Sequence, residues 1–211
     1  MFDARLQGLI QPVLQPPARW LLANGVSADR ITLAGFVPGL LAVPALAAGA
    51  HGLALILILA NRVADGLDGA VARLQGPTDR GAFLDIALDF AFYGLVVLGF
   101  ALSDPAANAL PAAFLLAAFM GTGSSFLAFA VLAARRGMAS TAFPRKGIYY
   151  LGGLTEGAET IAVFIAMALW PAAFPVLAVV FALACWVTTI MRWRLGWEAF
   201  AQERPRESAS Q

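Results

Sequence analysis

Residues 65–89 read DGLDGAVARLQGPTDRGAFLDIALD, a highly charged stretch next to the apolar runs of the chain. It sets aspartates, glycines and arginines between two long apolar runs of the chain. What these charges do depends on whether the flanking runs cross a membrane.

The composition of the chain indicates a membrane protein. Of 211 residues, 60% are hydrophobic and 13% are charged, whereas soluble domains average roughly 45–50% apolar and about 25% charged residues. We expect no secretory signal peptide, because the first strongly apolar run begins only near Ile31. The lone Cys185 excludes a disulfide within the chain, and the net charge of +1 gives no indication of a nucleic-acid partner.

Apolar segments long enough to cross a bilayer recur along the whole chain. A spanning helix needs about 20 mostly apolar residues, and the connections between the segments are too short for a second domain. The sequence therefore predicts an all-α integral membrane protein with a single domain over residues 1–211. The six predicted spans are Ile31–Ala50, Gly52–Arg73, Gly81–Ser103, Pro105–Ala134, Gly147–Trp170 and Pro171–Met191.

The basic residues orient these spans. Of the 14 lysines and arginines, only Arg62 lies in the interior of a span; the others precede the first span, flank the second-to-third connection, fill the fourth-to-fifth connection or follow the sixth span. Because cytoplasmic loops are enriched in Lys and Arg, both termini are predicted to be cytoplasmic. Residues 25–195 then form the membrane core and residues 196–211 a cytoplasmic tail.

The first 24 residues show a different pattern from the spans. Their apolar residues recur at helical spacing, with polar residues on the opposite side. This pattern predicts an amphipathic helix over residues 1–24 that lies in the cytoplasmic interface; the alternative is a poorly ordered leader. The apolar positions are Phe2, Leu6, Leu9, Ile10, Val13 and Leu14, and the polar ones are Arg5, Gln7 and Gln11.

Acidic residues lie inside the predicted spans, where a charge costs at least about 2.5–3.5 kcal/mol on insertion scales. The predicted topology places all of them at a similar depth near the cytoplasmic face. They are Asp65 and Asp68 in the second span, Asp85 and Asp89 in the third, and Glu156 and Glu159 in the fifth.

The spacing of the four aspartates favours a metal site. Asp65 and Asp68 are three residues apart, and Asp85 and Asp89 four, so each pair lies on one face of its helix. Four converging carboxylates repel one another unless they are protonated or neutralised. Mg²⁺ or Mn²⁺ are the natural neutralising ions for oxygen ligands, and a single histidine, His51, argues against a site for softer metals.

Glycines beside the aspartates indicate room for a bulky ligand. Gly66 and Gly69 accompany the acids, Gly81 opens the facing helix, and Arg73 follows one turn later with a guanidinium suited to phosphate oxygens. Phosphates bridged by metal ions fit this arrangement. The alternative interpretation is a set of helix-packing glycines and paired structural charges, as in a small carrier.

Together these residues resemble the signature of the CDP-alcohol phosphatidyltransferase family. The pattern Asp65-x2-Asp68-Gly69-x2-Ala72-Arg73, then Gly81-x3-Asp85-x3-Asp89, contains all of its acids, glycines, alanine and arginine in order. The segment GVSADRIT at residues 25–32 is similar to the family's sequence before the first span, with Ala28 in place of the usual proline.

The resemblance implies an enzyme of phospholipid synthesis. Such an enzyme moves the phosphatidyl group of CDP-diacylglycerol to the hydroxyl of a small polar alcohol and releases CMP, using two divalent ions, Mg²⁺ or Mn²⁺. It also implies a homodimer in a bacterial-type inner membrane, with the active site toward the cytoplasm. Asp65, Asp68, Asp85 and Asp89 would bind the metals, and Asp89 would also be the catalytic base. The residues implied to bind the CDP-alcohol are Asp29, Thr32, Gly69, Ala72, Arg73, Thr78 and Gly81.

Two features leave parts of the site open. Seven residues separate Arg73 from Gly81, where the family usually has eight, so either Thr78 or Asp79 takes the loop position that contacts nucleotide in relatives. For the acceptor, Arg145 and Lys146 are either anion-binding residues or plain topology signals. Glu156 is either part of the acceptor pocket or a structural partner of Arg62 or Lys146. The patch GTGSS at residues 121–125 suits close helix packing.

Two other functions compete with this interpretation. A cation- or proton-coupled carrier would use the acidic cluster, but it would not require Gly69, Ala72 and Arg73 at fixed spacing. A CDP-amino-alcohol phosphotransferase acting on diacylglycerol belongs to the same family, but such relatives tend to be longer, with additional spans. A divalent-dependent release of CMP from CDP-diacylglycerol distinguishes these possibilities.

Overall fold

The computed structural model describes residues 2–138 and 153–201, and the regular structure of these residues is entirely helical. This confirms the predicted all-α class. The elements are α1 (Phe2–Ala23), α2 (Ala28–Ala47), α3 (His51–Gln75), α4 (Asp79–Ser103), α5 (Pro105–Arg135), α6 (Gly157–Leu169), the short 3₁₀ helix η1 (Pro171–Ala173) and α7 (Phe174–Phe200).

Four helical stretches among the described residues are long and apolar enough to cross a membrane. They are α2, α4, α5 and the stretch Pro171–Phe200 that contains α7. The second predicted span is helical as α3 but carries Arg62, Asp65, Asp68 and Arg73, which lower its hydropathy. The last helix continues past Leu195 to Phe200, so the first residues of the predicted tail are helical.

The fifth predicted span, Gly147–Trp170, requires a correction. Its described helix, α6, has only 13 residues and begins at Gly157. The preceding Glu156 has extended backbone angles (φ −122°, ψ −171°) and serves as the N-cap. Residues 139–152 lie outside the described part of the chain.

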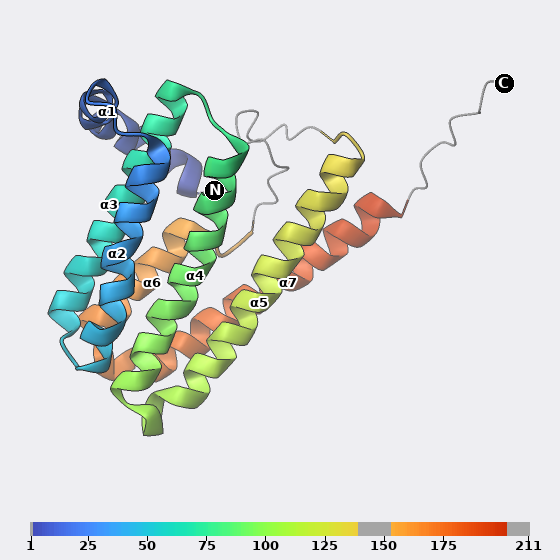
Figure 1. Ribbon diagram of the computed structural model, residues 1–211. Helices are drawn as coiled ribbons and strands as arrows, with labels where there is room; N and C mark the ends of the chain where they lie inside the picture. Colours follow the sequence, from blue (N-terminus) through green and yellow to red (C-terminus); the bar gives the residue numbers. More distant parts are fainter. Residues whose placement is uncertain (1, 139–152, 202–211) are drawn as a thin grey trace.

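The helices form a bundle in which α2 packs on both α3 and α4, and α5 packs on α7 (Figure 1). The α3–α4 connection lies at the same end of the bundle as α1, and the α2–α3 and α4–α5 connections lie at the opposite end. The aromatic core, with the fully buried Phe92, Phe100, Phe164 and Phe174, fills the bundle beyond the acidic residues.

Helix α1 confirms the predicted amino-terminal helix and packs across α3. Ala18 is fully buried and Leu14 packs in the same cluster, whereas Val13 and Trp20 are exposed. A Cβ atom at Gly66 would lie only 2.9 Å from the Leu14 side chain. Gly66 therefore makes room for α1, and the expectation that it makes room for a ligand is wrong.

Glycines also set the distances between the other helices. A Cβ at Gly35 of α2 would overlap the Cβ of Ala64 on α3. In α5, a Cβ at Gly121 would lie 3.1 Å from Thr189 of α7, and one at Gly123 would lie 2.9 Å from Phe90 of α4. The small residues of the GTGSS patch thus serve close packing, as predicted.

Candidate active site

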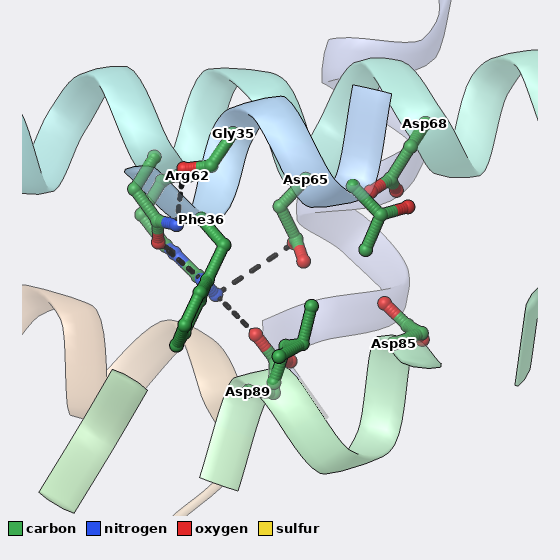
Figure 2. A pocket seen from close by; sticks show the side chains of 10 residues that line it. Gly35, Phe36, Arg62, Asp65, Asp68, Asp85 and Asp89 are labelled. Carbon is green, nitrogen blue, oxygen red and sulfur yellow. Dashed lines mark hydrogen bonds and ion pairs between the residues drawn. The ribbon is translucent and has the colours of Figure 1, made fainter. Parts of the chain in front are cut away.

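Three aspartates from two facing helices converge near the end of the bundle that carries the α3–α4 connection. One carboxylate oxygen from each of Asp65, Asp68 and Asp85 lies within 4.8 Å of the other two (Figure 2). Asp65 and Asp68 are a turn apart on α3, and Asp85 faces them from α4. Oxygen ligands in this arrangement suit a hard divalent cation.

The surroundings of Asp68 fit a bound cation. Asp68 is only 5% exposed, and its Oδ2 atom is buried with no hydrogen-bond partner among the described residues. A buried, unpartnered carboxylate oxygen is costly unless a cation or a proton satisfies it. Asp65, Asp68 and Asp85 are therefore the residues that would hold Mg²⁺ or Mn²⁺.

The fourth acid, Asp89, is not part of this cluster, although the sequence suggested that all four converge. Its Oδ1 atom accepts a hydrogen bond from Arg62 Nη1 at 2.9 Å, and the same nitrogen lies 3.7 Å from Asp65 Oδ2 (Figure 2). Arg62 thus connects the two helices that carry the acids. The sequence singled it out as the one basic residue in the interior of a span and as a possible partner of Glu156, but not as a partner of Asp89.

The cavity between these acids is small. It measures about 10 Å³, roughly the space of one water molecule or ion. The space between the carboxylates thus suits a small ion. The cavity is lined by Thr32, Gly35, Phe36, Asn61, Arg62, Asp65, Asp68, Asp85, Leu88 and Asp89.

Of the residues implied to bind the donor, Thr32 lines the same cavity as the acids, and the others lie on α2, α3 and α4 or in the α3–α4 connection. The guanidinium of Arg73 lies over Gly69, with Nη1 3.3 Å from where a Cβ of Gly69 would be. A Cβ at Gly81 would lie 3.3 Å from Asp29 Oδ1 and 3.1 Å from Thr78 Oγ1. Ala72 packs against the small apolar cluster under α1.

The shortened connection is closed by a helix cap. Thr78 is the N-cap of α4, and its hydroxyl oxygen accepts a hydrogen bond from Gly81 N at 3.1 Å. Gly76, which precedes it, has a φ of +94°, a conformation that favours glycine. Asp79 follows as the first residue of the helix.

Asp29 is held by an arginine that sequence reasoning missed. Arg80 Nε donates to Asp29 Oδ2 at 2.7 Å and joins the first turns of α2 and α4. Both residues line an open hollow of about 450 Å³ at this end of the bundle. An aspartate before one span and an arginine before another give no sequence signal that they pair.

Of the three residues predicted to bind the acceptor, only Glu156 lies in the described part of the chain. Arg145 and Lys146 lie outside the described residues. The Glu156 carboxylate accepts a hydrogen bond from Gly153 N at 3.1 Å, while its backbone N–H donates to Glu159 Oε2 at 3.0 Å. The Glu156 side chain also accepts from the backbone N–H of Glu159, and this bond and the one to Glu159 Oε2 form a capping box that gives both glutamates a structural role at the start of α6. Arg62, a suggested partner of Glu156, pairs instead with Asp89.

Comparisons with known proteins identify the family of this chain. A sequence profile described as CDP-alcohol phosphatidyltransferase matches residues 20–193. The chain is 51% identical over 192 residues to the inner membrane protein YnjF of Escherichia coli strain K12, covering 91% of this chain and 93% of YnjF. Over 73 residues, 34% of this chain and 37% of the relative, it is 41% identical to archaetidylinositol phosphate synthase of Methanothermobacter thermautotrophicus.

The fold is also that of a solved enzyme. Phosphatidylinositol phosphate synthase (PgsA1) of Mycobacterium tuberculosis, in complex with manganese and citrate, aligns with a TM-score of 0.72 at 24% identity, covering 91% of this chain and 93% of that one. The same enzyme with CDP-DAG bound aligns with a TM-score of 0.68 at 25% identity, covering 92% and 98%.

Proposed function

Because the chain belongs to the CDP-alcohol phosphatidyltransferase family, we propose that it transfers the phosphatidyl group of CDP-diacylglycerol to the hydroxyl of a small polar alcohol and releases CMP. The observation that carries this proposal is the carboxylate cluster of Asp65, Asp68 and Asp85, with Asp89 one turn further along α4. The binding of CDP-DAG by the similarly folded PgsA1 supports the choice of donor.

The metal requirement follows from the same cluster. Asp65, Asp68 and Asp85 would hold one Mg²⁺ or Mn²⁺ ion, and Asp89 would contribute to a second. Manganese in the solved PgsA1 supports a divalent ion of this kind. When bound, such ions neutralise the pyrophosphate and stabilise the attacking and leaving oxygens of an in-line displacement.

The chain's own residues would have separate roles in this reaction. Arg73 binds phosphate oxygens of the donor, while Gly69 and Gly81 leave space for the nucleotide. The acceptor hydroxyl oxygen attacks the phosphorus that bears the diacylglycerol, the bond from that phosphorus to the CMP oxygen breaks, and Asp89 takes the hydroxyl proton. Asp29, Thr32, Ala72 and Thr78 complete the proposed donor site.

The same proposal covers the placement in the membrane. The homologous YnjF is an inner membrane protein, and we place this chain there with α2 to α7 as its six membrane helices, of which α6, with 13 residues, is too short to cross the bilayer by itself. Both termini and the acidic cluster face the cytoplasm, with α1 in the interface. We also expect a homodimer, and an acceptor pocket that includes Glu156, Arg145 and Lys146.

The experiment that tests the proposal measures CMP release. Purified protein is mixed with CDP-diacylglycerol, Mn²⁺ or Mg²⁺, and a panel of water-soluble alcohols that includes inositol phosphate, glycerol 3-phosphate and serine. We expect CMP release that depends on both a divalent ion and one of the alcohols. Ion movement across proteoliposomes without CMP release under any of these conditions would favour a carrier instead.

A further inference from the structure

We propose that Arg62 is the counter-charge that positions Asp89, so that the site without donor holds one divalent ion and takes a second only together with the donor's pyrophosphate. This inference rests on the proposed function. It concerns a residue outside the aspartate signature and predicts how many ions the protein binds.

The contacts of Asp89 carry the first step. Arg62 Nη1 lies 2.9 Å from Asp89 Oδ1, whereas the cluster with oxygens within 4.8 Å of one another contains only Asp65, Asp68 and Asp85. The Arg62 side chain is 14% exposed and that of Asp89 29%. The pair is therefore largely shielded from water, where ion pairs are stronger than at the surface.

The surroundings of Arg62 show that its position is built into the fold. Its Nε and Nη2 atoms donate to Asn61 Oδ1 at 2.9 and 2.5 Å. The buried Asn61 in turn donates from Nδ2 to the backbone oxygen of Gly35 at 2.8 Å. The guanidinium also lies 4.3 Å from the centre of the Phe92 ring, a cation–π contact.

Glycine makes this arrangement possible. A Cβ at Gly39 of α2 would lie 2.8 Å from the Phe92 ring and 3.1 Å from Asn61 Nδ2. The absent side chain leaves room for the asparagine and for the ring on which Arg62 stacks. Helices α2, α3 and α4 thus fix the guanidinium against Asp89. Because the Arg62 side chain is already ordered by the fold, ligand binding does not have to order it at a further cost in conformational entropy.

The charges then decide how many ions bind. A first divalent ion meets three carboxylates at Asp65, Asp68 and Asp85, and Asp65 Oδ2 lies farther from Arg62 Nη1, at 3.7 Å, than Asp89 Oδ1 does, at 2.9 Å. A second ion at Asp89 would meet a carboxylate already paired with a fixed cation, and the guanidinium would repel it. The two negative charges of the donor pyrophosphate offset that repulsion, so the second ion and the donor bind together.

Electron paramagnetic resonance of Mn²⁺ tests this directly, with detergent-solubilised protein titrated with and without CDP. We expect the wild type to bind one Mn²⁺ per chain without CDP and two with it. Arg62→Gln should bind a second Mn²⁺ without CDP at least ~10-fold more tightly than the wild type does. Arg62→Lys keeps the charge and should remain at one ion. Arg194→Gln, which removes an exposed arginine of α7, should behave as the wild type.

A thermal measurement covers the case in which Arg62→Gln is unstable. Without metal its half-buried Asp89 lacks the Arg62 counter-charge, so Mn²⁺ should raise its melting temperature more than that of the wild type. The double variant Arg62→Gln/Asp89→Asn should lose this extra dependence. Two Mn²⁺ ions on the wild type without CDP, or unchanged Mn²⁺ binding in Arg62→Gln, would overturn the proposal. If CDP changed Mn²⁺ binding in no variant while the Arg62→Gln effect persisted, the proposed donor would be wrong and the role of Arg62 would stand.

Discussion

At the scale of single residues, Asp68 has the strongest need of a cation, because its buried Oδ2 atom has no partner among the described residues. We expect Asp68→Asn or Asp85→Asn to abolish turnover and to weaken Mn²⁺ binding, since each removes one charged ligand from a shared site. Asp104→Asn, at the opposite end of the bundle, is the control. Wild-type turnover in either cluster variant, measured as CMP release, would contradict the metal site.

Gly69 tests the donor side of the cluster. Gly69→Leu should fold, because leucine is a better helix former than glycine by close to 1 kcal/mol. Its side chain would occupy the space under the Arg73 guanidinium, 3.3 Å from the position of the new Cβ. We expect binding of CDP-diacylglycerol to be lost in calorimetry, with Gly52→Leu, which faces open space, as the control. Unchanged affinity would exclude this face as the donor pocket.

Asp89 separates proton transfer from metal binding. Asp89→Asn keeps an oxygen ligand, so donor affinity should be largely retained. The transfer rate should nevertheless fall by ~10²–10⁴, the usual contribution of a positioned general base. The comparison requires rates and donor affinities for the same preparation. A rate loss no larger than the loss of donor affinity would show that Asp89 is a ligand only.

At the scale of helices, the sequence predicted most of the architecture but not how helices face one another. The lengths of apolar runs gave α2 to α5 to within a few residues, because hydropathy reports burial in lipid. They failed at α6, whose start is set by the capping pair Glu156 and Glu159. Spacing put each pair of aspartates on one helix face. It gave no sign that Arg62 of α3 would pair with Asp89 of α4.

The contact between α2 and α3 is expected to support the site mechanically. A Cβ at Gly35 would overlap that of Ala64, so Gly35→Ala should push the helices apart and shift Asn61, which donates to the Gly35 oxygen. Overpacking of this kind costs roughly 1–3 kcal/mol. We expect a lower melting temperature in detergent and reduced CMP release, whereas Gly52→Ala, with nothing within 4 Å, should change neither. Equal effects of the two substitutions would show that the close α2–α3 contact at Gly35 does not support the site.

At the scale of the whole molecule, the two ends of the bundle have different tasks. The stacked rings of Phe100 and Phe174, 4.8 Å apart between centres, belong to the apolar core toward the α2–α3 and α4–α5 turns. The acidic cavity lies at the other end, beside α1 and the α3–α4 connection. The apolar half of the bundle thus packs against the half that carries the acids, and under the proposed topology the acidic cavity would open toward one side of the membrane.

Labelling from one side of the membrane determines which side that is. In a Cys185→Ala background, Pro77→Cys places a thiol in the α3–α4 connection and Ala106→Cys places one near the α4–α5 turn. The first lies between Arg73 and Arg80, whereas no lysine or arginine lies near the second, so the first should be cytoplasmic. We expect an impermeant maleimide to label only Ala106→Cys in intact spheroplasts, and to label both after permeabilisation. The reverse pattern would place the acidic cavity on the outer side of the membrane, away from the cytoplasmic pool of nucleotides, and the proposed transfer reaction could not proceed there.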